Sequence, residues 1–181
     1  SKSLQGREAQ IRYCVSCNSC WGEIIAGNNL QCDNNPRLGE DDEANWWPRP
    51  STNKKRVVIV GSGIAGMEAA WIAAARGHEV TLFGKSSEIG GKTKLHAALP
   101  GGENLSSIYD YQLLAARRAG VKIETGVNAT LDDILTCQAD SLVLATGSEI
   151  AWPDFLAVEY QNEGIFPDLR EACLGLLSHT C

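Results

Sequence analysis

RVVIVGSGIAG, residues 56–66, decides the fold of this chain. The β-branched run that opens it is typical of a strand buried on both faces of a sheet. The Ala-rich segment MEAAWIAAARG at 67–77 predicts a helix, and HEVTLF at 78–83 predicts a second strand. The stretch therefore opens a βαβ unit of the expected length, about 30 residues.

The turn between the first strand and the helix carries Gly61, Gly63 and Gly66 in the pattern G-x-G-x-x-G. This pattern is specific only where it joins a buried strand to a helix, as it does here. The first glycine permits a tight turn, the second lets the backbone approach a pyrophosphate, and the third lets the helix pack closely on the strand. The phosphates then meet the free N–H groups at the helix start.

Further strands and helices alternate along the chain. The predicted elements are a helix over 104–120, a strand over 121–125, a short helix opened by a capping box at 130–133, and a strand over 140–147. Asn104 is the expected N-cap of the long helix, and Gly120 lies just beyond its end. The fold class is α/β, a Rossmann-like parallel sheet with helices on both faces.

The chain divides by composition into four parts. We predict a cysteine-rich module over 1–45, a linker over 46–55, a dinucleotide-binding domain over 56–150 and the start of a further segment over 151–181. The sequence has no initiator Met and stops within a helical pattern that has no cap. We therefore expect it to be part of a larger protein or one subunit of a divided assembly.

Composition limits the classes of function. The net charge of −6 argues against nucleic acid as a partner, and no apolar run is long enough to span a membrane. The charged N-terminal stretch does not resemble a signal peptide. We expect a cytoplasmic protein, where structural disulfides are rare and seven cysteines need another explanation.

Four of the cysteines form one constellation, C-x2-C-x2-C followed by a more distant fourth. They are Cys14, Cys17, Cys20 and Cys32. Structural zinc usually draws its ligands from two separated C-x2-C pairs, and three successive thiolates on one small ion would curl the loop tightly. A 4Fe–4S cubane offers each thiolate a different iron, so we favour the cluster, with zinc as the alternative.

Other residues near this constellation and along the chain have simpler interpretations. Trp21 either shields the cluster from water or is an ordinary core tryptophan. The scattered Cys137, Cys173 and Cys181 are expected to be small, buried and inert. The second strand departs from the usual pattern at Gly84, which stands where an acidic residue would bond the adenosine ribose, and Lys85 follows it. This pair is compatible with a 2′-phosphate, or with a dinucleotide held mostly by backbone groups.

The order of these motifs over residues 5–150 resembles the C-terminal half of the trimethylamine dehydrogenase and 2,4-dienoyl-CoA reductase family of iron–sulfur flavoproteins, which includes N-methyl amine and betaine demethylases. The stretches that carry the resemblance are CVSCNSCW, RVVIVGSGIAGMEAA, HEVTLFGKSSEIGGK and LVLATG. In that family an FMN-bearing (β/α)8 barrel comes first, a 4Fe–4S cluster follows, and the last domain binds FAD or, in some members, ADP.

The resemblance implies a set of site residues. It places the cluster on the four cysteines, and it places the dinucleotide on Gly61, Gly63, Ala65, Gly66, Gly84, Lys85, Gly91, Lys92, Val127, Ala145, Thr146 and Gly147. The catalytic residues and the FMN contacts would lie on the barrel, outside this chain, so none is assigned here.

The resemblance implies the electron-transfer part of a flavin oxidoreductase, acting with an FMN barrel that demethylates a small methylated amine. Further expectations are an electron-transfer flavoprotein as acceptor, NAD(P)H as reductant and an oligomeric assembly. The alternative within the class is an NADPH-dependent enoyl-thioester reductase. A different class also fits the residues, a zinc-stapled nucleotide-binding assembly module without redox activity.

Overall fold

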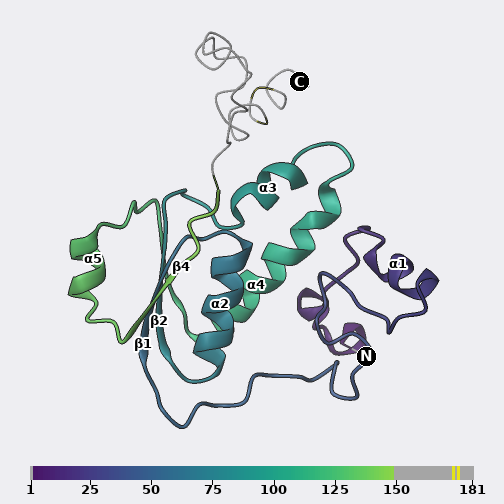
Figure 1. The fold of residues 1–181 in the computed structure, drawn as a ribbon, viewed down its shortest axis with the longest axis horizontal. Coiled ribbons are helices and arrows are strands. Elements are labelled where there is room, and N and C mark those ends of the chain that lie inside the picture. Colours follow the sequence, from purple (N-terminus) through teal and green to yellow (C-terminus); the bar gives the residue numbers. More distant parts are fainter. Residues whose placement is uncertain (1, 149–172, 174, 176–181) are drawn as a thin grey trace.

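The protein is built on a four-stranded parallel sheet, shown in Figure 1 by a computed structural model that describes residues 2–148, 173 and 175. The strands are β1 (Arg56–Val60), β2 (Glu79–Gly84), β3 (Lys122–Thr125) and β4 (Ser141–Leu144), in the order β3-β2-β1-β4. In the register, Val58 of β1 lies opposite Thr81 on one side and Leu142 on the other. The parallel α/β sheet predicted from the sequence is confirmed.

Helices account for most of the remaining regular structure. They are α1 (Ser19–Ile25), α2 (Ile64–Ala75), α3 (Gly91–Ala97), α4 (Ser106–Ala119) and α5 (Leu131–Thr136), with short 3-10 helices η1 (Ser3–Gln5), η2 (Glu8–Gln10) and η3 (Glu103–Leu105). The N-terminal segment forms the two separate turns η1 and η2. Gly6 interrupts them in a left-handed conformation, with φ +63°.

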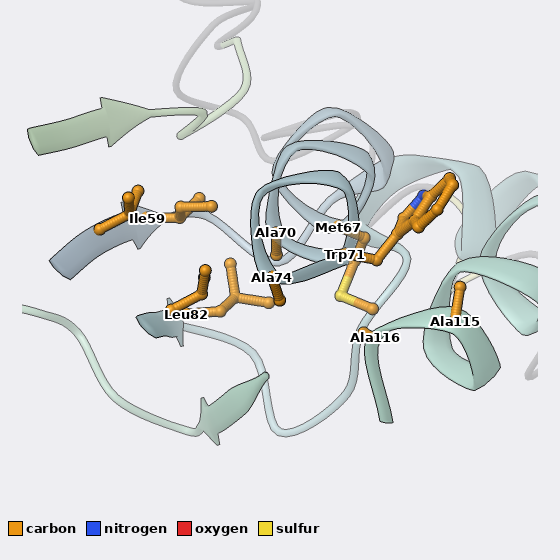
Figure 2. Close-up of a cluster of buried hydrophobic side chains, with 10 residues drawn as sticks. Ile59, Met67, Ala70, Trp71, Ala74, Leu82, Ala115 and Ala116 are labelled. Atoms are coloured by element: carbon orange, nitrogen blue, oxygen red, sulfur yellow. The ribbon is translucent and has the colours of Figure 1, made fainter. Parts of the chain in front are cut away.

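The hydrophobic core lies between one face of the sheet and the pair α2 and α4 (Figure 2). Ile59 and Leu82 project from adjacent strands toward α2, and both are fully buried. Trp71 of α2 is also fully buried and packs toward α4. Since α2 begins directly after the glycine-rich turn, this packing fixes where the turn presents its backbone.

The opposite face of the sheet is less covered by the described residues. Leu142 and Leu144 of β4 are 45% and 69% exposed. Helix α5 leaves two of its three large apolar residues exposed, Leu131 at 69% and Leu135 at 63%, and only Ile134 is half-buried. Of the two predicted helical layers, the described part of the chain therefore shows only the layer formed by α2 and α4.

Of the helix caps predicted from the sequence, two are present in the structure and one is not. Gly120 caps α4 in the left-handed region, with φ +82°, and Thr130 and Asp133 form the predicted capping box. Hydrogen bonds from Thr130 lower the pKa of the Asp133 carboxyl. Asn104 is not the N-cap of α4: Leu105 holds that position, and the Asn104 amide instead donates to Ser16 Oγ over 3.2 Å.

The predicted linker is anchored to the nucleotide domain. Trp46 and Trp47 contact the ring of Trp71, with centroid distances of 6.0 Å and 5.7 Å. Pro48 is buried beside them. This aromatic contact fixes the N-terminal module against α2. No helix in the described residues is both long enough and apolar enough to cross a membrane.

Candidate functional site

A cleft of about 550 Å³ lies along the ends of β1 and β4, where the glycine-rich turn leads into α2. Its lining residues are Gly61, Ser62, Gly63, Ile64, Ala65, Lys85, Ser86, Gly90, Gly91, Lys92, Thr93, Leu144, Ala145, Thr146, Gly147 and Ser148. The carboxyl ends of the strands in an open α/β sheet are where ligands usually bind. The cleft therefore brings together three motifs that lie far apart in the sequence.

The three glycines of the first turn do different structural work. A Cβ on Gly61 would lie 2.1 Å from the Ala145 carbonyl oxygen, and one on Gly66 would lie 1.8 Å from the Gly61 carbonyl oxygen. Backbone atoms therefore leave no room for a side chain at either position. A Cβ on Gly63 would meet no atom within 4 Å. The missing side chain of Gly63 thus leaves an open cradle at the N-terminus of α2, where free N–H groups favour an anion.

Two adjacent glycines after β2, Gly90 and Gly91, fold back onto this turn. The Gly90 N–H donates to the Ser62 carbonyl over 2.8 Å, and Gly90 and Gly63 form a parallel bridge. A Cβ on Gly91 would lie 3.0 Å from the Gly63 Cα. The segment after β2 is therefore part of the cleft wall and not a free loop.

The charge of the cleft is opposite to that of the whole chain. Lys85 and Lys92 line it, and its lining within the described residues includes no Asp or Glu, although the chain has a net charge of −6. Lys92 Nζ donates to the carbonyl and to the hydroxyl of Ser148, which connects α3 to the turn after β4. A basic cleft over a helix N-terminus is suited to a phosphate-containing ligand.

Most of the predicted dinucleotide residues line this cleft, and three do not. Gly66 lies behind the turn, where α2 packs on it. Gly84 is buried, and its carbonyl accepts a hydrogen bond from the Val127 N–H over 2.9 Å. The sequence prediction missed Ser62, Ile64, Ser86, Gly90, Thr93, Leu144 and Ser148. Each of these is a direct neighbour of a predicted residue, and spacing alone does not show which neighbours face the cleft.

The four cysteines of the N-terminal module are free thiols. Cys14 and Cys17 are exposed, whereas Cys20 in the first turn of α1 and Cys32 in the following loop are half-buried. The Ser16 N–H donates to Cys14 Sγ over 3.3 Å, the kind of contact that a thiolate accepts. Within residues 2–148, 173 and 175, no three His, Cys, Asp or Glu residues are grouped closely enough to hold a metal ion.

Two hydrogen-bonded links nevertheless hold the cysteine segments beside one another. The Ser19 hydroxyl, next to Cys20, donates to the carboxylate of Asp33, next to Cys32. Asn34 is 3% exposed, and its amide donates to the Tyr13 carbonyl over 2.9 Å. The segments before Cys14 and after Cys32 are therefore held together.

The loop between the first cysteines curls tightly. Ser16 and Asn18 are both left-handed, with φ +60°, which turns the chain after each of the first two cysteines. Trp21 is 62% exposed, so its interpretation as a core tryptophan is wrong. Cys173 is buried as expected, but Cys137 is only half-buried, and Cys181 lies outside the described residues.

Arg12 connects the cysteine module to the nucleotide domain. Its guanidinium donates to the Asn34 carbonyl over 2.7 Å and forms an ion pair of 3.3 Å with Glu68 of α2. The guanidinium carbon also lies 4.0 Å from the ring centroid of Tyr111 in α4. The side chain is 13% exposed, so these contacts are largely shielded from water.

Glu68 extends this connection to the cleft. Its Oε2 accepts hydrogen bonds from Trp71 Nε1 over 2.8 Å and from Gln112 Nε2 over 2.9 Å. Gln112 also donates to the carbonyl of Ile64, a residue that lines the cleft, over 3.0 Å. One polar network thus joins the cysteine module, α4 and the first turn of α2.

We expect the variant Arg12→Met to lower the free energy of unfolding by about 1–2 kcal/mol, because Glu68 loses a charged partner in a shielded site. Denaturant unfolding followed by tryptophan fluorescence measures it. Arg56→Met is the control, since Arg56 and Asp140 form an exposed pair at 4.0 Å worth at most about 1 kcal/mol. Equal losses in the two variants would contradict a structural role for the Arg12 network.

Comparison with known proteins gives a consistent set of relatives. The family model described as pyridine nucleotide-disulphide oxidoreductase matches residues 55–172. The NADH oxidase of Thermoanaerobacter brockii is 37% identical over 167 residues, which is 91% of this chain and 26% of that protein. The N,N-dimethylglycine/sarcosine dehydrogenase of Chromohalobacter salexigens is 38% identical over 146 residues, 77% of this chain and 20% of that protein.

A solved structure extends the similarity to nearly the whole chain. The 2-naphthoyl-CoA reductase in complex with 2-naphthoyl-CoA is 31% identical, with a TM-score of 0.81, over 99% of this chain and 26% of that one. The chain therefore spans about a quarter of the length of these relatives. The N,N-dimethylglycine/sarcosine dehydrogenase and the 2-naphthoyl-CoA reductase among these matches confirm the family resemblance predicted from the motifs.

Proposed function

The chain belongs to the pyridine nucleotide-disulphide oxidoreductase family, and we propose that it is the electron-transfer part of a larger iron–sulfur flavoprotein. The observation that carries this proposal is the basic cleft in which Gly63 leaves an open cradle at the start of α2. Its backbone N–H groups would bind the pyrophosphate of FAD, with ADP as the alternative. Lys92 would hold the turn after β4 against the ligand.

We also propose that the N-terminal module, residues 1–45, binds a 4Fe–4S cluster through Cys14, Cys17, Cys20 and Cys32. The donor chemistry fits, because all four side chains are free thiols and the Ser16 N–H already contacts a cysteine sulfur. The links around Asn34 and Asp33 would hold the four segments within reach of one another. When bound, a cluster of this kind supplies one-electron transfer and the flavin supplies two-electron chemistry.

About three quarters of the length of the relatives lies outside the part that this chain matches, and we propose that the corresponding part of the whole protein carries the substrate site. We propose an FMN-binding (β/α)8 barrel there, oxidative demethylation of a small methylated amine, and an electron-transfer flavoprotein as acceptor. The proposal is supported by the similarity to N,N-dimethylglycine/sarcosine dehydrogenase. In this arrangement, residues of the present chain bind cofactors and conduct electrons, and bond breaking belongs to the barrel.

A second candidate function is the reductase portion of an enoyl-thioester reductase that uses NADPH. The similarity to 2-naphthoyl-CoA reductase over 99% of the chain supports it. The same cleft and cysteine module would then deliver electrons toward the substrate. The two candidates differ in the direction of electron flow and not in the residues of this chain.

The proposal is tested by measuring iron, acid-labile sulfide, zinc and released flavin on one sample of the full protein purified without oxygen. We expect about four iron and four sulfide per chain, with flavin at a fixed ratio. One zinc ion per chain without sulfide would contradict the electron-transfer proposal and favour a zinc-stapled assembly module. Reduction by NADPH compared with reduction by a methylated amine then separates the two oxidoreductase candidates.

A further inference from the structure

The first turn of α4 contains Ser107, which is only 1% exposed. Helix α4 lies between α2 and the N-terminal module (Figure 1). In the described part of the chain, the Ser107 hydroxyl makes two hydrogen bonds, and both go to this module. It donates to the Tyr13 carbonyl over 2.8 Å and accepts from the Asn34 amide over 3.0 Å. The nucleotide domain thus holds the module through a buried hydroxyl that both donates and accepts.

The two partners of Ser107 stand beside the first and the last cysteine of the constellation. The Tyr13 carbonyl belongs to the peptide bond that joins Tyr13 to Cys14. It accepts a second hydrogen bond from the amide of Asn34, two residues after Cys32, over 2.9 Å. Two donors therefore fix the plane of this peptide bond, and the plane sets the direction in which the Cys14 side chain leaves the backbone.

These contacts do not depend on a bound group. Among the described residues, the four thiols of the module are not gathered around one centre. The hydrogen bonds from Ser107 and Asn34 to the Tyr13 carbonyl are nevertheless already made. A site whose supporting contacts exist in advance needs less ordering when its group binds, and contacts of this kind affect metal affinity strongly.

We propose that Ser107 is a positioning residue of the metal centre on the cysteine module, so that the nucleotide domain supplies part of that centre. The inference rests on the proposed function of the four cysteines as ligands of a 4Fe–4S cluster. Ser107 acts through the backbone of Tyr13 and the amide of Asn34, and so orients Cys14 relative to Cys32. The module would then hold its cluster most firmly when it is docked on α4.

The test measures how fast the full protein, purified without oxygen, loses iron to a chelator. Ser107→Ala removes the hydroxyl and leaves one buried N–H of the Asn34 amide unpaired. We expect iron release about tenfold faster than in the wild type, with flavin content unchanged. We also expect an altered electron paramagnetic resonance spectrum of the reduced cluster. This spectrum reports ligand geometry, which a general loss of stability does not change.

A neighbouring serine supplies the matched control. Ser106→Ala also removes a hydroxyl from the start of α4, but that hydroxyl contacts the phenol oxygen of Tyr13 and not the backbone beside Cys14. Iron release and the spectrum should stay as in the wild type. Wild-type behaviour of Ser107→Ala, or equal changes in Ser106→Ala, overturns this inference alone. A wild-type protein that contains no iron and no sulfide overturns the proposed cluster, and this inference with it.

Asn34→Ala removes the same contact from the module side, and it carries the test if Ser107→Ala loses flavin as well as iron. It should also release iron faster while it keeps its flavin. The double variant should release iron more slowly than the product of the two single effects predicts, because the two side chains act as one unit. Unchanged iron release in Asn34→Ala, or fully multiplicative effects in the double variant, overturns the inference.

Discussion

Gly63→Asp is expected to lower dinucleotide affinity at least about a hundredfold while the domain still folds. Gly63 has φ −71° and ψ 179°, an extended conformation that any residue adopts, and a Cβ placed there meets no atom within 4 Å. Aspartate at this N-cap would even favour α2. Its carboxylate, however, fills the open cradle and repels the pyrophosphate. Flavin content after purification and the far-UV circular dichroism spectrum measure the two effects.

The matched control lies three residues along the same turn. Gly66→Ala adds a single methyl group, but its Cβ would lie 1.8 Å from the Gly61 carbonyl oxygen, so α2 must move away from β1. We expect this variant to lose stability and binding together. Full flavin content in Gly63→Asp would contradict the placement of the pyrophosphate. Loss of fold in Gly63→Asp would contradict the open geometry of the cradle.

The fold was predictable because its signals are local. The β-branched run of β1 is buried on the sheet, and the glycine turn leads into an Ala-rich helix that the core encloses. Helix α4 ends at the cap Gly120, and helix α5 begins at the capping box of Thr130 and Asp133. Both ends are set by contacts within a few residues. Patterns of this kind are determined by backbone geometry close to the residue itself.

Contacts between distant segments were not predictable in the same way. Asn104 has the side chain of an N-cap, but its amide contacts Ser16 in the cysteine module, and a 3-10 turn precedes α4 instead. The ion pair between Arg12 and Glu68 joins residues 56 positions apart. Similarly, Ser62 fills the space beside Gly84 only because β1 and β2 are neighbours in the sheet. Tertiary packing selects these partners, and no spacing rule encodes them.

The cysteine module occupies an intermediate position. The C-x2-C-x2-C spacing was enough to identify the candidate ligand cysteines. Only the structure shows the hydrogen bond between Ser19 and Asp33 that holds Cys20 and Cys32 in neighbouring segments. Convergence of several thiols on one centre is stabilised mainly by the bonds to the bound group, because folding and metal binding are coupled in small modules. The hydrogen-bonded links at Asp33 and Asn34 therefore hold the segments beside one another, and on our proposal the bonds to a cluster would bring the four thiols onto one centre.

Cys20→Ser is expected to reduce iron and acid-labile sulfide from about four per chain to near zero. Serine offers a harder oxygen donor that holds iron–sulfur clusters poorly, and removal of one of four ligands opens the site to solvent. The nucleotide domain should remain folded, since Cys20 lies in α1 and the core is formed by β1, β2, α2 and α4. Elemental analysis and flavin content on the same oxygen-free sample report both outcomes.

Cys137→Ser is the matched control, because Cys137 is also a half-buried free thiol but follows α5, in the nucleotide domain. It should leave iron, sulfide and flavin unchanged. Retention of iron in Cys20→Ser, or its loss in Cys137→Ser, would contradict the assignment of the N-terminal constellation. A combined loss of flavin and iron in Cys20→Ser would instead indicate that the network through Arg12 and Glu68 couples module loading to the dinucleotide cleft.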